Sequence, residues 1–396
     1  MAPLAMAGYH VDISYDLLGD LPHDRRSVQG AEALKRHYQP GDIGPTTVLV
    51  YQKDGDLDSI KGRKKIAQLS ASLAKLPGVK TVRSLTQPTG DPPKRRGLTF
   101  RGLRRRTINV HPRTRAIYLT QEPELAGTVT RLDLVLTEDP FSKRSVTQFN
   151  DVDRYLQNLG EDPNSAWYGA KFEFLGATAG VRDLEAVTLG DSTLIRQLVV
   201  IAVLIVLILI LRSPLICFYL VASVVFSYLV TIGATELVFG WAYGDSFSGL
   251  DWKAPIFLFV ILIAIGEDYN IYLTTRIFEE QRRFGLIEGL RQAVSKTGGI
   301  ITSCGLIMAG SFMSMMTGTL RAMSELGFAL SLGVLLDTFV VRPILVPCFL
   351  ALLYRWRGVE DSSPELSTDD PRTAPPEGVP KPPKKPHSVQ PQRASS

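Results

Sequence analysis

The stretch that decides the fold lies at residues 254–275 and reads APIFLFVILIAIGEDYNIYLTT. It is long enough to cross a bilayer, because roughly 17–25 mainly apolar residues span about 30 Å of hydrocarbon. Only Glu267 and Asp268 carry charge within it. Four other stretches meet the same criterion, and they lie at residues 194–211, 215–238, 298–320 and 326–354. The sequence therefore predicts an α-helical polytopic membrane protein with five spans in a membrane domain at 194–354.

The basic residues beside these spans predict their direction, because Lys and Arg concentrate in short cytoplasmic loops. Eight basic residues lie on one side of the membrane and two on the other. We therefore expect a multi-pass protein of the cell (inner or plasma) membrane with a cytoplasmic C-terminus. Because five spans is an odd number, residues 1–190 then lie outside, with 1–44 as an extracytoplasmic N-terminal segment. Export of a domain needs a preceding signal or span, so we expect that a first transmembrane helix is missing from this chain.

Residues 45–190 predict an extracytoplasmic, porter-like α+β domain. Strand patterns occur at 46–51, 79–85, 128–137 and 172–175, and helical spacing occurs at 60–76 and 142–159. The order is β-α-β followed by β-α-β, which is the split βαβ pattern of a ferredoxin-like fold. From residue 177 a helix is expected to run directly into the first span.

A basic insertion at 90–115 interrupts this domain. It contains nine basic residues and one acid, which more than accounts for the net charge of +5. Anionic lipid headgroups are one expected contact, and a solvated insertion without a ligand is the other interpretation. Nucleic acid is not an expected partner outside the membrane. Two further segments lie on the cytoplasmic side. Residues 276–297 predict an amphipathic helix there, and residues 355–396 predict a disordered Pro-rich tail.

Ionisable residues within a span cost at least a few kcal/mol each, so they mark candidate functional sites. Asp268 and Tyr269 are the predicted proton relay. Glu267 points about 100° away from Asp268 on a helix, and it is either an accessory group or a structural one. Asp337 and Arg342 are further accessory candidates, although five residues is too far round an α-helix for an ideal pair.

Small residues and absent motifs complete the prediction. Gly298, Gly299, Ser303 and Gly305 are expected to allow close helix packing. The sequence holds no metal-ligand cluster, phosphate loop or Ser-His-Asp arrangement. We therefore predict a protein that is not an enzyme and needs no metal or cofactor.

Several motifs together resemble the signature of MMPL-type exporters in the RND superfamily, over about residues 10–356. They are the run Gly266–Leu273 with Arg276, Glu279, Glu280 and Gly285, the run Thr297–Ser303, Phe312, and the late Val341, Arg342, Pro343 and Pro347. The resemblance implies that Arg276 belongs to the motif as an accessory residue, and that Asp268 and Tyr269 carry protons.

The resemblance also implies an architecture of two halves and twelve spans, in which proton movement drives the export of lipids or other hydrophobic molecules. This chain supplies one such half and one Asp-Tyr motif, and the tail with no following span favours the C-terminal half. The expected partners are therefore the missing N-terminal half, membrane lipids, a hydrophobic substrate, and a further copy in a homo-oligomer.

Other interpretations stay open from the sequence. One is a membrane scaffold that senses lipid or sterol without transporting it, and another is a fragment that is inactive without its partner half. An intramembrane aspartyl protease would need two aspartates sharing a proton. Asp337 is the one candidate for the second aspartate, and no protease motif surrounds it.

Overall fold

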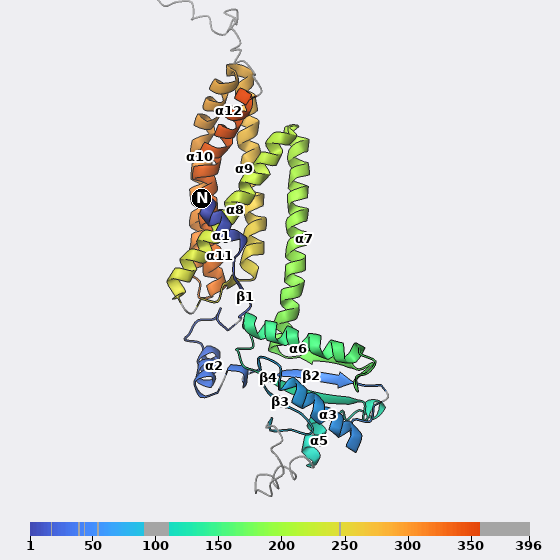
Figure 1. Ribbon diagram of the computed structural model, residues 1–396. Helices are drawn as coiled ribbons and strands as arrows, with labels where there is room; N and C mark the ends of the chain where they lie inside the picture. The colour runs from blue at the N-terminus through green and yellow to red at the C-terminus, as the bar shows by residue number, and fades with distance from the viewer. Residues whose placement is uncertain are drawn as a thin grey trace, which may run out of the picture.

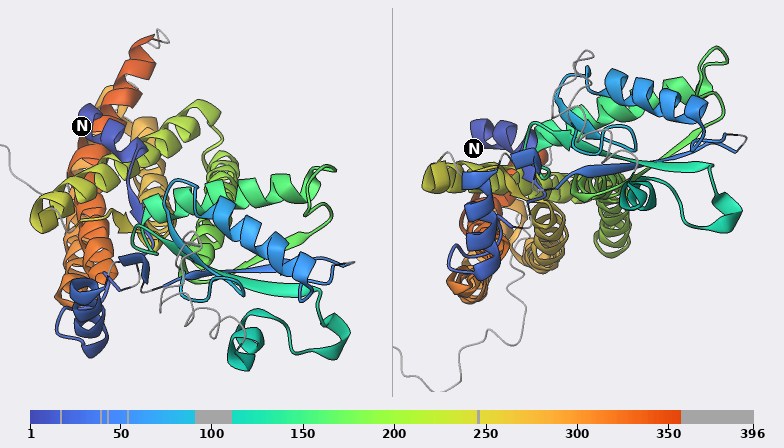
Figure 2. Two further views of the ribbon diagram at one scale, coloured as in Figure 1. Left: turned by 60° about the horizontal axis from the view of Figure 1, so that its bottom comes forward. Right: turned by 90° about the horizontal axis from the view of Figure 1, so that it is seen from below.

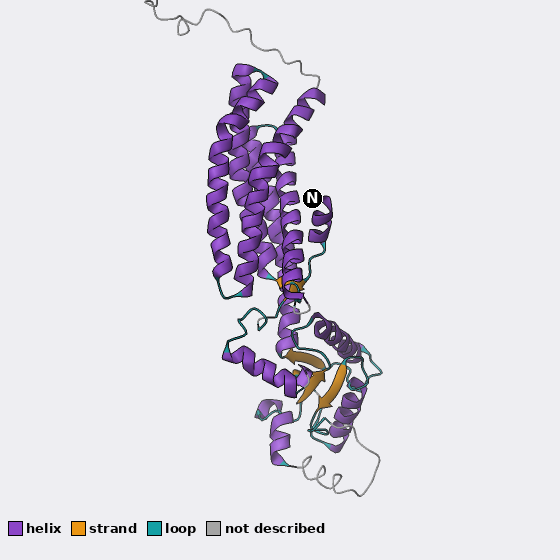
Figure 3. Ribbon diagram, turned by 90° about the vertical axis from the view of Figure 1, so that its left-hand side faces the viewer, coloured by secondary structure: helices purple, strands orange, loops and turns teal. Residues whose placement is uncertain are grey.

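The computed structural model describes residues 1–16, 18–38, 40–42, 44–53, 55–90, 111–244 and 247–356. A long helix bundle and a smaller α+β domain lie end to end, and the long helix α7 (Ala177–Leu211) joins them (Figures 1 and 3). Seen from the α+β end, that domain lies to one side of the bundle axis (Figure 2). Most of the predicted basic insertion and all of the tail beyond residue 356 fall outside the described residues.

The α+β domain is built on a four-stranded antiparallel sheet with the strand order β3-β4-β2-β5. Its strands are β2 (Thr46–Tyr51), β3 (Val79–Arg83), β4 (Val129–Leu136) and β5 (Lys171–Leu175). In the register, Val48 faces Leu132 on one side and Phe174 on the other. The predicted β-α-β and β-α-β order is therefore present. Strands β2 and β4, one from each unit, pair at the centre of a single sheet.

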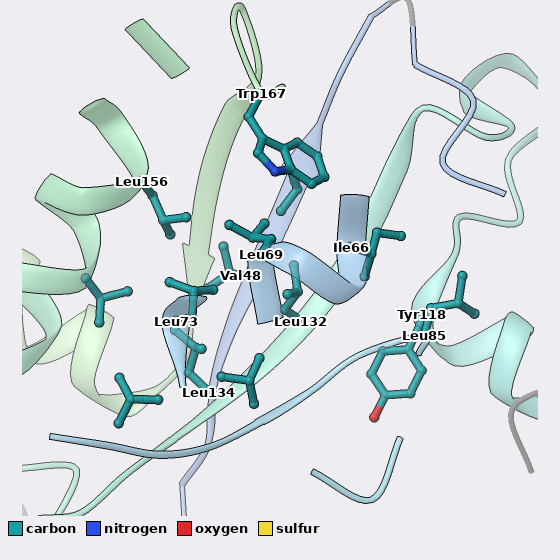
Figure 4. Close-up of a cluster of buried hydrophobic side chains, with 14 of the residues drawn as sticks. Val48, Ile66, Leu69, Leu73, Leu85, Tyr118, Leu132, Leu134, Leu156 and Trp167 are labelled. Carbon is teal, nitrogen blue, oxygen red and sulfur yellow. The ribbon is translucent and has the colours of Figure 1, made fainter. Parts of the chain in front are cut away.

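Helices α3 (Ile60–Leu73) and α6 (Lys143–Glu161) cover one face of this sheet (Figure 4). Each begins at a serine whose hydroxyl accepts a backbone N–H, Ser59 from Gly62 over 3.0 Å and Ser142 from Ser145 over 3.1 Å. Such caps satisfy amide groups that have no partner within the helix. The core between helices and sheet is mainly apolar, and it includes Val48, Leu69, Leu73, Leu132, Leu134, Leu156 and Trp167.

Smaller elements surround this sheet. They are α2 (Arg26–His37), the 3-10 turns η1 (Pro40–Asp42) and η2 (Pro123–Leu125), and α5 (Pro112–Tyr118). The last residues of the predicted basic insertion, 111–115, are therefore described, and they cap and begin α5.

Within the described residues, the bundle contains five helices that are long and apolar enough to cross a membrane. They are α7, α8 (Pro214–Tyr243), α9 (Lys253–Phe284), α10 (Leu286–Ser314, extended by η4, Met315–Thr317), and a last helix made of α11 (Arg321–Leu336), η5 (Asp337–Leu345) and α12 (Val346–Trp356). All five extend beyond the apolar stretches, because helical hydrogen bonding continues where the sequence becomes polar.

The predicted separate helix at 276–297 is not present. Helix α9 continues to Phe284, Gly285 turns the chain with a φ of 83°, and α10 begins at Leu286. Glu280 explains why α9 and α10 remain helical through these polar residues. Its carboxylate is 1% exposed and binds Arg276 at 2.6 Å on α9 and Lys296 at 3.0 Å on α10, so these polar turns pack against each other.

The first residues of the chain lie against the bundle. Helix α1 (Ala2–Tyr9) packs along α8 (Figure 1). Backbones meet closely there, because a Cβ on Gly8 would stand 2.0 Å from the Leu229 carbonyl oxygen, and one on Gly233 would stand 2.2 Å from that of Leu4. The short strand β1 (Ile13–Ser14) then pairs in parallel with β6 (Leu250–Asp251). The predicted N-terminal segment 1–44 thus begins packed on helix α8. It then runs to the end of the bundle nearer the α+β domain, where β1 pairs with β6.

Helix α7 is fixed within the α+β domain and is exposed along one side where it runs beside the bundle. Within the α+β domain, Arg182 binds Asp153 at 2.5 Å and lies 4.7 Å above the ring of Phe149. Beyond the domain, only 11% of the most apolar 18-residue stretch of α7 is buried. Side chains such as Leu209 are 71% exposed. The α+β domain is therefore attached firmly to a helix that packs on the bundle along one side only, through residues such as Leu207 and Leu211.

Candidate functional site in the helix bundle

A polar stripe runs along the inward side of α9. Glu267, Asn270 and Thr274 are 4%, 0% and 0% exposed, and their spacing of three and four residues places them on one side of the helix. Asn270 Nδ2 donates to Glu267 Oε2 over 3.3 Å. Sequence reasoning singled out Glu267 but missed its two companions, and the helical spacing that starts at Glu267 is the signal that could have found them.

The π-helical segment η5 lies beside this stripe. It contains Pro343, which lacks the N–H that a regular α-helix needs at that position. Because a π-helix bonds residue i to i+5, residues five apart come to the same side. Arg342 Nη2 consequently forms an ion pair with Asp337 Oδ2, and the two residues are 2% and 5% exposed. The prediction that this spacing is too wide for a pair is wrong because it assumed an α-helix.

Contacts between α9 and η5 join these groups into one cluster. A Cβ on Gly266 would stand 3.6 Å from Asp337 Oδ2, so this glycine brings the two segments close. The Arg342 guanidinium lies 4.3 Å above the ring of Tyr269, which is within the range of a cation–π contact. We call Glu267, Tyr269, Asn270, Asp337 and Arg342 the polar core cluster.

The polar core cluster and its neighbours hold buried polar atoms whose hydrogen bonds are incomplete. Buried polar groups nearly always find partners, so a concentration of such atoms marks a place able to bind protons or water. Within the part of the chain that the structure describes, seven of these atoms have no hydrogen-bond partner: Glu267 Oε1, Asn270 Oδ1, Thr274 Oγ1, Asp337 Oδ1, Thr338 Oγ1, Arg342 Nε and Arg342 Nη1.

Asp268 faces the other way. It is exposed on the outer side of α9, and among the described residues its carboxylate makes no hydrogen bond or ion pair. The structure thus separates the two adjacent acids, with Glu267 in the core and Asp268 on the surface. Tyr269 lies between these environments, since it is half-buried and its ring contacts Arg342.

The remaining predicted residues lie elsewhere. Arg276 binds Glu279 and Glu280 at 2.8 and 2.6 Å, two turns from Asp268 along α9. Gly305 packs so closely that a Cβ would stand 2.3 Å from Thr338 Oγ1. In contrast, Gly298 and Gly299 have open space beside them, and Ser303 is exposed with its hydroxyl bonded to the Gly299 carbonyl. Of the four predicted packing residues, the structure brings only Gly305 into a tight helix contact within this chain.

In the described ranges, no group of three or more His, Cys, Asp or Glu side chains could hold a metal ion. Five apolar helices around an ion-paired polar centre, attached to an α+β domain, define a polytopic membrane protein with ionisable groups in its core.

The model of the MMPL family matches residues 20–370, and the chain belongs to this family. It is 27% identical over 352 residues to the apo-petrobactin exporter of Bacillus anthracis. The aligned region covers 87% of this chain and 40% of that relative. It is 31% identical over 333 residues to ActII-3, a membrane protein of Streptomyces coelicolor, with coverage of 83% and 38%. It is 35% identical over 215 residues to the sulfolipid-1 exporter MmpL8 of Mycobacterium tuberculosis, with coverage of 54% and 19%. The chain thus spans two fifths or less of these relatives' lengths.

Proposed function

We propose that this chain is half of an exporter that uses the proton gradient to move lipids or other hydrophobic molecules out of the cell. Membership of the MMPL family supports this, together with relatives named as exporters of apo-petrobactin and of sulfolipid-1. The observation that carries the proposal is the polar core cluster, where two buried carboxylates and one arginine stand inside an apolar bundle.

In this proposal Asp268 and Tyr269 form the relay. A charged residue at the centre of a bilayer costs roughly 2.5–3.5 kcal/mol or more, so an exposed Asp268 is expected to face protein rather than lipid tails. The surface around it is therefore assigned to the missing half. Open space at Gly298 and Gly299 on the neighbouring α10 suits the same contact. Tyr269 then links Asp268 on this surface with Arg342 in the core.

Glu267, Asp337 and Arg342 act as accessory groups in this scheme. The cluster holds two carboxylates and one guanidinium, so it has one negative charge in excess when both carboxylates are ionised. Binding one proton neutralises it. A charged group in a medium of low dielectric constant is costly, so protonation and deprotonation would alternate between a neutral and a charged core. That alternation supplies the energy difference that a coupled movement needs.

The α+β domain is assigned to the extracytoplasmic side as a ferredoxin-like porter domain. Its strand order, with the first and third strands central and antiparallel, supports the fold. The excess of basic residues at the opposite end of the bundle supports the orientation in the inner or plasma membrane. Trp241 and Trp356 are 88% and 83% exposed near opposite ends of the bundle, as expected for aromatic residues at the two membrane interfaces.

The test is Asp268→Asn in the whole transporter, reconstituted into vesicles with a pH gradient. We expect proton-driven efflux of the hydrophobic substrate to be lost while insertion into the membrane is retained. Asp151→Asn, which removes an exposed carboxylate from α6, is the matched control and should transport normally. Undiminished efflux by the Asp268 variant would refute the relay.

A further inference from the structure

A cavity of about 430 Å³ lies between the α+β domain and the nearer end of the bundle. Its walls come from the β1 segment, the turn between β4 and α6, the first turn of α6, the start of α7, and Ser248. Cavities of roughly 300–1,000 Å³ are the usual size for small-molecule sites. The cavity therefore has the volume for a ligand and a position between the two parts of the molecule.

One part of the cavity wall is apolar. Tyr15, Val146 and Val181 form a small buried cluster, and Ile13 and Phe141 pack against it. All five residues line the cavity. This surface comes from three separate segments of the chain, and it suits the hydrocarbon or aromatic body of a ligand.

The polar part of the wall holds more carboxylates than cations, with Asp16, Glu138, Asp139 and Glu185 against Lys143 and Arg144. Asp139 is bound by Lys35 at 2.8 Å, and the cationic Lys143 is bound by Asp12 at 2.6 Å. Glu138 and Glu185 also line the cavity. Among the described residues, neither of these two carboxylates makes a hydrogen bond or an ion pair.

Tyr15 supplies a second polar feature. The residue is 6% exposed and its ring stacks on Trp252, with ring centroids 6.2 Å apart. Its hydroxyl has no hydrogen-bond partner in the part of the chain that the structure describes. Burial raises the pKa of Tyr15 above its usual value, and the Glu185 carboxylate raises it further. The hydroxyl is therefore a protonated donor beside an unpaired carboxylate.

We propose that this cavity binds an amphiphile whose polar end carries an ammonium group next to an oxygen atom. The apolar body lies on Tyr15, Val146 and Val181, the ammonium group binds Glu138 and Glu185, and the Tyr15 hydroxyl donates to the oxygen. Anionic heads are disfavoured, because carboxylates outnumber the cations Lys143 and Arg144 in the wall. This inference rests on the proposed function, since it names the substrate class of the exporter.

The test uses the purified full chain in phosphatidylcholine nanodiscs and three photoreactive probes. All carry the same dodecyl chain with a diazirine, and their heads are hydroxyethylammonium, neutral glycol or sulfate. Crosslinked residues are mapped by mass spectrometry. We expect saturable labelling around the cavity by the ammonium probe, with the neutral and sulfate probes much weaker there. Equal labelling by the ammonium and neutral probes would overturn the proposal.

Variants identify the groups involved. Glu138→Gln with Glu185→Gln should weaken labelling by the ammonium probe at least tenfold, because it removes both of the charged acceptors that bind the ammonium group. Tyr15→Phe should weaken it about threefold, which corresponds to one neutral hydrogen bond. Glu161→Gln, at the far end of α6 and exposed, is the control and should label normally. A carboxylate double variant that keeps its elution profile and labels like the wild type would refute the site.

This readout is independent of transport. Selective labelling in a protein that shows no proton-driven efflux would leave the site standing and remove the proposed exporter function. Efflux without selective labelling would do the reverse.

Discussion

The core of the α+β domain and the core of the helix bundle are opposite in chemistry. In the domain, apolar residues such as Leu134 are 0% exposed and lie between sheet and helices, while the buried Asp133 lies on the other face of the sheet. In the bundle, Arg342 is 2% exposed and Leu209 on α7 is 71% exposed. The domain thus buries its apolar surface from water, whereas the bundle turns apolar surface toward lipid or another protein and keeps ionisable groups inside. The same residue type therefore contributes very differently to stability in the two regions.

The largest effect is expected where charge is buried. Arg342→Met leaves the Asp337 carboxylate unpaired in the bundle core, which should cost about 3–5 kcal/mol. The apparent Tm of the detergent-solubilised protein, followed as loss of monodisperse protein on heating, measures it. Asp337→Leu in the Arg342→Met background should recover most of the loss. An unchanged Tm for the single variant would mean that the buried ion pair within η5 does not stabilise the bundle.

The apolar core of the domain should respond next. Leu134→Ala removes a fully buried side chain and should destabilise the domain by about 3 kcal/mol, through lost burial and a residual cavity. Hydrogen exchange of β4 reports the domain separately from the bundle. Leu175→Ala, at a site that is 68% exposed on β5, should leave this exchange unchanged. Similar effects of the two variants would contradict the packing described for this sheet.

Helix contacts in the bundle should be sensitive at one glycine and tolerant at another. Gly305→Ala places a methyl group against Thr338 and should cost about 1–3 kcal/mol by overpacking. Gly299→Ala meets open space and should be neutral or slightly stabilising, because alanine favours helix by up to about 1 kcal/mol. Thermal stability of both variants in the isolated chain tests this. The opposite order of stabilities would show that α10 packs with another face inward.

The smallest effect belongs to the bare side of α7. Ile205 is 53% exposed, so Ile205→Ala should change the stability of the isolated chain by no more than about 0.5 kcal/mol. Measured beside Leu134→Ala, it gives the contrast between the two regions directly. A loss comparable to that of Leu134→Ala would place Ile205 in a packed interface of the chain itself.

The sequence predicted this architecture where the pattern is local and repeated. Hydropathy located the five apolar helices, alternation located the strands, and the helical angle between Glu267 and Asp268 correctly separated one acid from the other. The helix ends were less predictable, because hydrogen bonding continues through polar turns such as those around Glu280.

Other features depend on contacts that no local pattern carries. The Asp337–Arg342 pair follows from a π-helical turn, for which Pro343 is a weak signal. The pairing of β1 with β6 joins two-residue strands more than two hundred residues apart. The packing of α1 on α8 depends on two glycines far apart in sequence. These arrangements are selected by the assembled tertiary structure rather than by propensity.

The contacts of Arg182 with Asp153 and Phe149 have a mechanical consequence. Helix α7 has 35 residues, which corresponds to a rod about 52 Å long. Its first turns are fixed to α6 by an ion pair and a cation–π contact, whereas its last turns pack on the bundle through Leu207 and Leu211. The rod and the sheet therefore turn as one lever arm: a tilt of about 10° displaces one end of such a rod by about 9 Å relative to the other. A small rotation in the membrane is thereby converted into a displacement as large as the width of a helix.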